Sequence, residues 1–478
     1  VLDRHGVGAG DRVAVMLRND FPFLEATYGA QLLGAVPVPV NWHYRRDEAG
    51  FILIDSAAKA VVVHADLLGE IAGVVPAGCA VLAVDVPEDL AAACRIAAVT
   101  APPELSWDAA VREAVSWPHP PLPAAASMIY TSGTTGRPKG IRRRRPLDPA
   151  APGFAATLAV LGIAPGMRTV VCGPLYHSAP NLFGQLAGRM GGLVVLQPRF
   201  DAEQLLAMIE RYSISALHLV PTMMIRMLRL PAEVRARYDV SSVSCVAHAA
   251  APCPPQIKRA FIDWFGPVVN EYYGGSETTA VVACTSEEWL AHPGTVGRAL
   301  VDCEVRIYSE GGTELGPGEV GDIYLWNAGV GDFTYEGRDQ DRTAIERDGL
   351  VTVGDMGYLD EDGYLYLCDR RRDMIIAGGV NIYPAEIEAV LSTHPDVADC
   401  AVIGVPHEEF GESVLAIVQP GEVATRDGEG IRAFLRERIA DYKVPRRIEF
   451  TDQLPREDSG KVFKQRLRSR YWPTGRSI

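Results

Sequence analysis

The sequence predicts an α/β fold: a large N-terminal domain of two layered α/β sheets plus a small β-barrel, followed by a small α+β domain. Three observations lead to this fold class. Apolar strand-like runs alternate with helical segments as far as residue 278, short β segments with glycine turns occupy 294–367, and a charged break precedes a last set of helices and strands. A chain of 478 residues is long enough for several domains, which we place at 1–370 and 371–478.

The first 65 residues predict one layered unit. Apolar runs at 12–17 and 59–63 predict strands, and apolar side chains recur at helical spacing within 21–34 and 47–58. The two prolines within 36–40 exclude a helix there, so this segment is expected to be extended. Strands separated by helices indicate a layered α/β sheet.

A second layered unit follows an Ala- and Pro-rich stretch, 68–123, that predicts no clear element. Strands and helices alternate again, with strands at 169–172, 193–196, 216–220 and 243–246 and helices at 202–212 and 223–228. Each strand runs into a loop of small or polar residues. Because open α/β sheets bind ligands beyond the ends of their strands, we expect the site at these loops.

Beyond residue 294 the pattern changes from alternating layers to short β segments. Strands at 305–308, 322–326 and 364–367, joined by glycine turns, predict a small barrel or sandwich. After the charged break at 369–373 a compact α+β unit is expected, with helices from Pro384 and at 430–442 and strands at 397–405, 414–418 and 447–450.

The composition excludes several classes of function. The formal net charge of −14 argues against nucleic acid or an anionic membrane as the main partner. Nine Cys without a C-x-x-C pair are typical of reduced thiols in a cytoplasmic protein. No apolar stretch reaches the length of a membrane span, and no signal peptide precedes the first strand.

The segment from Thr131 to Gly140 is the strongest functional signal. It holds three Gly, four hydroxyl residues, Arg137 and Lys139 without a carboxylate, and it follows an apolar run, 128–130, that predicts the end of a buried strand. Backbone N–H groups, hydroxyls and cations together suit a polyphosphate. It is not a Walker A loop, because Pro138 stands where that motif needs Gly. A flexible linker or turn remains the alternative.

Three further features have both a structural and a functional interpretation. In the strand and glycine turn at 267–278, Tyr side chains could stack on a base and Glu277 could hold Mg²⁺, or they could be packing residues and a helix-start carboxylate. The four cations Arg142 to Arg145 could form a solvated surface face or hold a phosphate. Lys461, alone on an exposed turn, could serve solubility only.

Taken together in this order, the motifs closely resemble the adenylate-forming enzymes, which include acyl-CoA synthetases, firefly luciferase and peptide-synthetase adenylation domains. The resemblance covers nearly the whole chain and rests on at least five separated motifs. The family usually has a further strand and helix at its N-terminus, so we expect the chain to be truncated there. The resemblance also implies that the C-terminal domain is a mobile lid.

The resemblance assigns a nucleotide site. It implies a phosphate loop, a Tyr273 ring that stacks on adenine with Ala249 to Pro252 beside the base, a Ser276 hydroxyl near the α-phosphate, and Glu277 as the magnesium ligand. Asp355 and Arg370 match the residues that hold the ribose hydroxyls. The cofactor-binding residues are then Thr131, Ser132, Gly133, Thr134, Thr135, Gly136, Lys139, Ala250, Ala251, Pro252, Tyr273, Asp355, Arg370, Gly378 and Gly379.

The resemblance also assigns the catalytic and hinge residues. Lys461 matches the lysine that bridges the carboxylate and the α-phosphate, and His177 matches the gate beside the carboxylate. Arg372 falls at the hinge, where the family more often has Asp or Lys, and the turn Gly378-Gly379 would line the pantetheine tunnel. The catalytic set is Lys461, His177, Glu277 and Ser276, and the expected acid pocket is lined by His177, Asn181, Val220, Thr222, His248, Ala249 and Gly275.

We therefore expect an ATP-dependent acyl-CoA synthetase that uses ATP, Mg²⁺ and CoA. The acid would be adenylated with release of pyrophosphate and then transferred to CoA with release of AMP, while the lid rotates about Arg372. The sequence resembles synthetases for medium-chain, aromatic or alicyclic acids, bile acids among them. Ser178 follows the gate where amino-acid activators of the family place Asp, which argues against an amino-acid substrate.

Several alternatives stay open at the level of the sequence. The acceptor could be a carrier-protein thiol, or the adenylate could undergo a luciferase-like oxidation. An ATP hydrolase or kinase would instead yield phosphate or ADP, and an inactive binding protein would not keep both Glu277 and Lys461. The expected partners are a small carboxylic acid and CoA, with no nucleic acid and no integral membrane segment, and a homodimer is left open.

Overall fold

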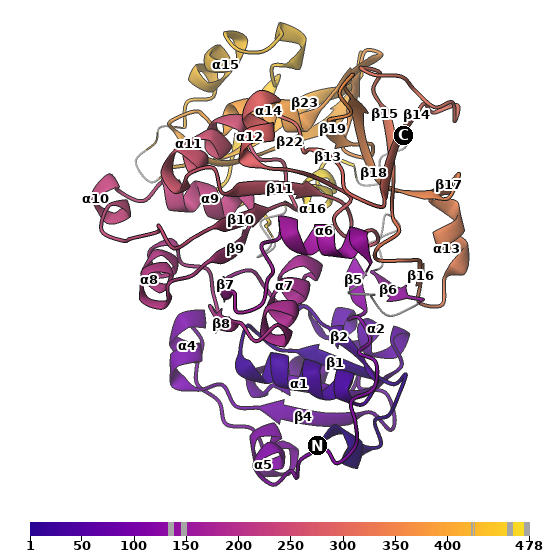
Figure 1. The fold of residues 1–478 in the computed structure, drawn as a ribbon. Helices are drawn as coiled ribbons and strands as arrows, with labels where there is room; N and C mark the ends of the chain where they lie inside the picture. The colour runs from indigo at the N-terminus through magenta and orange to yellow at the C-terminus, as the bar shows by residue number, and fades with distance from the viewer. Residues whose placement is uncertain (132–137, 145–150, 422–423, 425, 457–461, 473–478) are drawn as a thin grey trace.

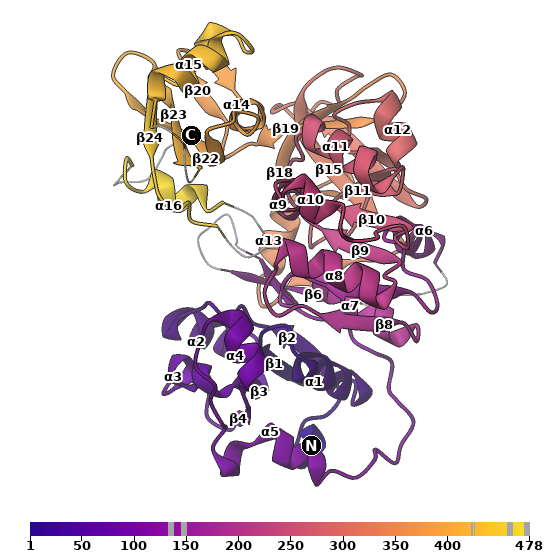
Figure 2. The same ribbon diagram turned by 90° about the vertical axis from the view of Figure 1, so that its left-hand side faces the viewer.

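The computed structural model describes residues 1–131, 138–144, 151–421, 424, 426–456 and 462–472. The N-terminal sheet, the central sheet and the C-terminal unit form three successive blocks along the molecule (Figures 1 and 2). Among the described residues, no helix is long and apolar enough to cross a membrane. The observed mixture of α/β layers, an antiparallel β unit and a small C-terminal α+β unit confirms the predicted fold class.

The first block is a four-stranded parallel sheet in the order β2-β1-β3-β4. The strands are β1 (Arg12–Met16), β2 (Val36–Pro39), β3 (Ala58–His64) and β4 (Ala80–Val84), and the helices are α1 (Phe21–Leu32), α2 (Arg46–Asp55), α3 (Leu68–Ile71), α4 (Glu88–Cys94) and α5 (Trp107–Arg112). The segment expected to be extended is the edge strand β2, where proline is tolerated because no strand of the described residues pairs with its outer side; there Pro37 O accepts a hydrogen bond from Met128 N. Strand β4 and helices α3, α4 and α5 lie in the stretch that predicted no clear element.

The second block is a seven-stranded sheet in the order β13-β12-β11-β10-β9-β7-β8. Its parallel strands are β7 (Arg168–Val171), β8 (Leu193–Leu196), β9 (Ala216–Leu219), β10 (Cys245–His248) and β11 (Val269–Tyr273), and the antiparallel pair β12 (Val282–Cys284) and β13 (Arg298–Ala299) closes one edge. The helices are α6 (Pro152–Val160), α7 (Ser178–Arg189), α8 (Ala202–Tyr212), α9 (Pro221–Leu228), α10 (Ala232–Arg235), α11 (Pro255–Phe265) and α12 (Ser286–Ala291). Every strand predicted for this unit is present.

Two antiparallel sheets join the second block to the rest of the chain. The glycine loop connects β5 (Ile129–Thr131) to β6 (Lys139–Arg143), and β16 (Phe333–Tyr335) completes that three-stranded sheet. The unit predicted as a small barrel is a five-stranded antiparallel sheet of β14 (Cys303–Tyr308), β15 (Gly321–Asn327), β17 (Glu346–Arg347), β18 (Leu350–Leu359) and β19 (Leu365–Arg370), with α13 (Asp339–Ala344) beside it. Strand β5 is only half-buried, contrary to the buried strand expected before the loop.

The C-terminal unit has its own sheet and its own core. Strands β20 (Ile375–Ala377), β21 (Val380–Ile382), β22 (Val397–His407), β23 (Gly411–Pro420) and β24 (Arg447–Phe450) pack with α14 (Pro384–Leu391), α15 (Gly428–Arg436) and α16 (Lys464–Arg468). Figure 2 shows this unit beside the sheet that contains β18 and β19. Helix α15 ends at Arg436, six residues earlier than the predicted end at 442.

Candidate active site

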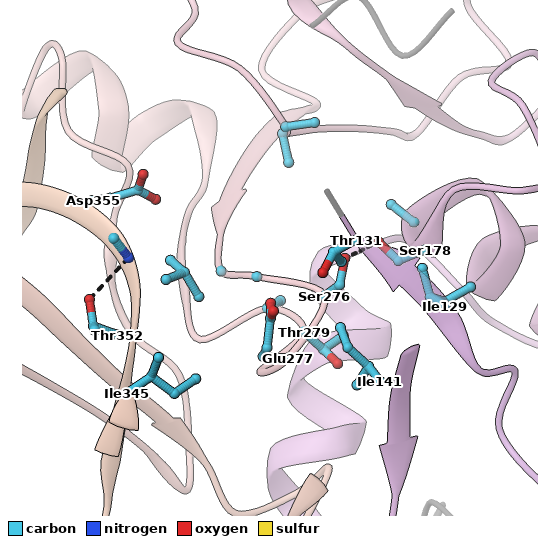
Figure 3. Close-up of a pocket in the computed structure, with 18 of the residues that line it drawn as sticks. Ile129, Thr131, Ile141, Ser178, Ser276, Glu277, Thr279, Ile345, Thr352 and Asp355 are labelled. Carbon is cyan, nitrogen blue, oxygen red and sulfur yellow. Dashed lines mark hydrogen bonds between the residues drawn. The ribbon is translucent and has the colours of Figure 1, made fainter. Parts of the chain in front are cut away.

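A cleft of about 1610 Å³ lies where the loops of the seven-stranded sheet meet the antiparallel sheets and the C-terminal unit. Its wall includes β5, β6, the turn at 274–280, the bend of β18 and residues 370–372, with contributions from β20, β21 and α16. Figure 3 shows Asp355 on one side of the cavity, Thr131, Ser178 and Ser276 on the other, and Glu277 between them. The predicted strand-end location of the site is therefore where the structure has its large cleft.

The turn that follows β11 carries a carboxylate suited to Mg²⁺. Oε1 of Glu277 accepts a hydrogen bond from the hydroxyl of Tyr335 at 3.0 Å. Oε2 lies over Gly275, where a Cβ would come within 2.8 Å of it. Among the residues described, no group of three or more His, Cys, Asp or Glu side chains could hold a metal ion, so a metal here would be held by this carboxylate together with substrate phosphates. That is how proteins usually hold Mg²⁺, and the site fits it.

Ser276 connects this turn to helix α7. Its hydroxyl donates to that of Ser178, the first residue of α7, at 3.1 Å (Figure 3). Both side chains line the cleft. Ser178, known from the sequence only as the residue after His177, thus faces the position expected for the α-phosphate.

The hairpin β5–β6 holds the two ends of the glycine loop. Thr131 pairs with Lys139 across the hairpin, and both line the cleft. The ammonium of Lys139 lies 2.9 Å from Asp341 and 5.2 Å from the ring centre of Tyr335. The expected phosphate-binding residues Ser132, Gly133, Thr134, Thr135 and Gly136 lie outside the described residues.

The run of arginines is not a solvated face along its whole length. Arg142 pairs with Glu336 and Arg144 with Asp332 near the surface. Arg143, by contrast, points into the cleft and donates to the backbone oxygens of Ser276 and Glu277. The surface interpretation is wrong for Arg143 because alternate residues of a strand face opposite sides, so Arg143 shares the cleft face with Lys139 and Ile141. Arg145 lies outside the described residues.

Asp355 and Arg370 face each other at the opposite side of the cleft. Nε of Arg370 lies 3.3 Å from Oδ1 of Asp355, and both residues line the wall. Asp355 also accepts a hydrogen bond of 2.9 Å from Tyr273. The ring of Tyr273 is packed in the core behind the wall, whereas its neighbour Tyr272 lines the cleft and bonds His218 at 2.8 Å.

The loop after β10 contributes a strained backbone. Ala250 has φ 74, a conformation that non-glycine residues seldom adopt. Ala249 and Ala250 line the cleft, whereas Ala251 and Pro252 do not. The strained residue therefore lies where the base of a nucleotide is expected.

The connection between the two domains is held from both sides. Arg371 makes two hydrogen bonds, 2.7 and 2.9 Å, to the carboxylate of Asp322 on β15. Arg468 on α16 donates to the backbone oxygen of Arg372, the expected hinge, and to Asp373 at 2.6 Å. Gly378 and Gly379, with φ 59 and 82, form the β20–β21 turn but are not part of the wall. Lys461 lies outside the described residues.

Four residues of the expected acid pocket do not line the cleft: His177, Val220, Thr222 and His248. Val220 and Thr222 lie at the start of α9, and His177 caps α7 with its ring 4.4 Å from that of Tyr176. His248 is fully buried, 3.6 Å from Glu271, and burial together with the charge of Lys258 holds its pKa well below the usual value.

His248 belongs to a polar core cluster. Its neighbour Glu271 pairs with Lys258 on α11 at 2.6 Å, so the imidazole lies among buried charges on the α11 side of the sheet. Asn181, Ala249 and Gly275 do line the cleft.

A ladder of three amides and one guanidinium forms one wall, of which the sequence predicted Asn181 alone. Arg189 donates to Gln31 at 2.5 Å, Gln31 to Gln185 at 2.9 Å, and Gln185 to Asn181, and all four residues line the cleft. Gln31 lies on α1, whereas the other three lie on α7. Through Gln31 the ladder ties α7 to α1 of the first block.

Comparisons with known proteins agree along nearly the whole chain. Residues 1–332 match the AMP-binding enzyme family and residues 386–461 match the AMP-binding enzyme C-terminal domain. A feruloyl-CoA synthase from an Amycolatopsis species is 33% identical over 475 residues, 98% of this chain and 90% of the relative. A 2-succinylbenzoate–CoA ligase from Geobacillus kaustophilus is 33% identical over 470 residues, 98% of this chain and 89% of the relative.

A solved structure has the same architecture. The o-succinylbenzoate CoA synthetase from Bacillus subtilis, in complex with its acyl-adenylate intermediate, superposes with a TM-score of 0.78 at 28% identity. The superposition covers 98% of this chain and 90% of that one.

Proposed function

The chain belongs to the AMP-binding, adenylate-forming enzymes, and we propose that it joins an aromatic carboxylic acid to CoA through an acyl-adenylate. Its full-length relatives are CoA ligases, which confirms the recognition of an AMP-forming acyl-CoA synthetase. The relatives named above act on feruloyl and 2-succinylbenzoyl groups, both aromatic, and this supports the aromatic choice among the three acid classes that the sequence left open.

One observation carries the proposal. A single cleft has cations and a carboxylate at one side, at Lys139, Arg143 and Glu277, and an acid–arginine pair at the other, Asp355 and Arg370. The first group suits a polyphosphate and the second suits ribose hydroxyls, as a nucleoside triphosphate requires. Glu277, on the same turn as Ser276, lies between Asp355 and Thr131 in Figure 3.

The reaction needs charge neutralisation more than proton transfer. A carboxylate oxygen attacks the α-phosphorus of ATP, the bond between the α- and β-phosphates breaks, and pyrophosphate leaves. Mg²⁺ held by Glu277 supplies positive charge at the phosphates when it is bound. The hydroxyls of Ser276 and Ser178 are bonded to each other, and both residues line the cleft.

In the second step the CoA thiolate attacks the acyl carbon and AMP leaves with the electron pair of the broken C–O bond. We propose that Lys461 is the cation of the first step. We also propose that Arg372 is the hinge about which the C-terminal domain rotates, so that Lys461 leaves the active site before the second step. The contacts on either side of Arg372 support this, because Arg371 is held by the large domain and Asp373 by α16 of the small one. A homodimer and a cytoplasmic location stay predictions.

A screen of pyrophosphate release tests the proposed function. The purified protein is incubated with ATP, Mg²⁺ and a panel of aromatic, medium-chain and alicyclic acids, with and without CoA. We expect AMP and pyrophosphate with an aromatic acid, and an acyl-CoA thioester only when CoA is present. Formation of ADP would overturn the ligase assignment, and a preference for an aliphatic acid would overturn the aromatic one.

A further inference from the structure

Arg143 ties the glycine-loop hairpin to the turn that carries Ser276 and Glu277. It is the last residue of β6, and its guanidinium donates to the backbone oxygen of Glu277 at 2.5 Å and of Ser276 at 2.9 Å. A third contact, 3.3 Å, reaches the hydroxyl of Thr279. One side chain therefore holds both ends of the segment in which the metal ligand lies.

We infer that Arg143 is a positioning residue that fixes the turn carrying Glu277, the proposed metal ligand, against strand β6. The inference rests on the proposed function and deepens it, because it concerns the same ATP site. Lys139 and Arg143 stand at the two ends of β6 on one face, about 13 Å apart along an extended strand. Strand β6 thus separates Lys139 from the point at which Arg143 holds the turn.

The bonding pattern suits an arginine, and Arg143 makes no hydrogen bond to the side-chain carboxylate of Glu277. A planar guanidinium can donate to two carbonyl oxygens at once, which a lysine ammonium cannot do with the same fixed geometry. Because Arg143 binds the backbone of Glu277 and not its side chain, it orients the carboxylate without consuming its oxygens. Burial lowers the pKa of Arg143 to about 10, so the group stays charged at neutral pH.

The turn has few other connections to the hairpin. Its internal bonds run from Thr279 N to the oxygen of Gly275 at 2.8 Å and from Gly275 N to the hydroxyl of Thr278 at 3.0 Å. Thr279 is itself in a left-handed conformation, with φ 60. The turn is also bonded to α7, through the hydroxyls of Ser276 and Ser178, and to Tyr335, through the carboxylate of Glu277. The hydrogen bonds that tie its backbone to β6 come from Arg143.

The test compares Arg143→Gln with Arg142→Gln, two adjacent arginines on opposite faces of one strand. Arg142 pairs with Glu336 and its side chain is 48% exposed, outside the cleft wall. Amide hydrogen exchange of residues 274–281 is measured in the ligand-free protein, where catalysis plays no part. Arg143→Gln should speed exchange in this segment about tenfold, because it removes charged hydrogen bonds, whereas Arg142→Gln should leave it within about twofold.

A second readout concerns the metal. The Mg²⁺ concentration for half-maximal ATP binding, measured by calorimetry, should rise about tenfold in Arg143→Gln and stay unchanged in Arg142→Gln. Arg143→Lys, which keeps the charge and is the safer variant for folding, should restore little of either property. Unchanged exchange and unchanged Mg²⁺ dependence in a folded Arg143 variant would overturn the inference. Neither readout needs an acid substrate, so failure of the substrate screen would leave this result interpretable.

Discussion

The hydroxyl of Tyr273 donates to Asp355 across 2.9 Å and thereby joins the end of β11 to the bend of β18. Burial and the negative charge of Asp355 raise the pKa of Tyr273 well above its usual value, so the hydroxyl keeps its proton. The resemblance implies a ring that stacks on adenine, but in this structure the ring is core and only the hydroxyl reaches toward the cleft. Tyr273 thus orients the carboxylate opposite Arg370.

We predict that Tyr273→Phe raises the KM for ATP about fivefold, because Asp355 loses one of its two partners while the ring stays packed. The turnover number should change less than KM. Steady-state pyrophosphate release at varied ATP measures both. Tyr358→Phe is the matched control, since Tyr358 stacks on Tyr366 outside the wall, and an equal effect there would contradict the specific role of Tyr273.

Glu277→Gln should lower the rate of pyrophosphate release by about 10²–10³, because the amide keeps the shape of the side chain but not its charge. The loss should be partly relieved by raising Mg²⁺. Glu288→Gln, which removes a surface partner of Arg298, should have no such effect. A variant Glu277→Gln with normal Mg²⁺ dependence would show that the carboxylate does not hold the metal.

Lys461→Ala should abolish acyl-adenylate formation while sparing thioester formation from supplied acyl-adenylate. The physical reason is that the lysine neutralises charge only while two anions approach each other. The two half-reactions are measured separately, by pyrophosphate release and by acyl-CoA formation. Equal loss in both would refute separate roles for the two steps, and Lys443→Ala provides a control on the small domain, where Lys443 pairs with Glu386.

Asp369 gives the stability of the hinge region a pH dependence. Burial raises the pKa of this carboxyl to about 6, while its oxygens accept from the backbone N–H groups of Arg370 and Ala385. Because the folded state binds this proton more tightly than the unfolded state, the contribution is present below about pH 4 and is lost as the pH rises through about 6. The total change is about 3 kcal/mol at most.

Asp369→Asn should therefore become more stable relative to the natural protein as the pH rises. The two melting temperatures should be similar at pH 4, where both side chains are neutral, and should diverge toward pH 7.5. Thermal unfolding at several pH values measures the difference between the two melting temperatures. Groups that titrate alike in both proteins do not contribute to this difference. A constant difference across this range would contradict the raised pKa.

Much of the site could be predicted from the order of the motifs. Thr131 and Lys139 at the two ends of the glycine loop, residues 274–277 of the turn, Asp355 and Arg370 all border one cleft. The surface interpretation of Arg143 failed because it treated four consecutive arginines alike, whereas the side chains of a strand alternate and only one face meets the cleft.

Other parts had no signal in the sequence. Tyr335 bonds Glu277 from 58 residues away, and Gln31 meets Gln185 across two different blocks. Neither contact can be predicted from a local sequence pattern, because both contacts depend on how separate parts of the fold pack against each other. The proline-containing strand β2 was recognised only as extended for the same reason, since its role as an edge strand depends on its neighbour β1.

By itself the sequence determined the family, the chemistry of the individual motifs and the alternation of strands and helices, because these depend on residue type and on short-range spacing. The tertiary structure decided which face of each strand borders the cleft. It also decided which charged side chains are paired within the core and which line the cleft wall. That difference is physical: hydrogen bonds such as Arg143 to the Glu277 backbone form only when segments over a hundred residues apart are brought together by packing.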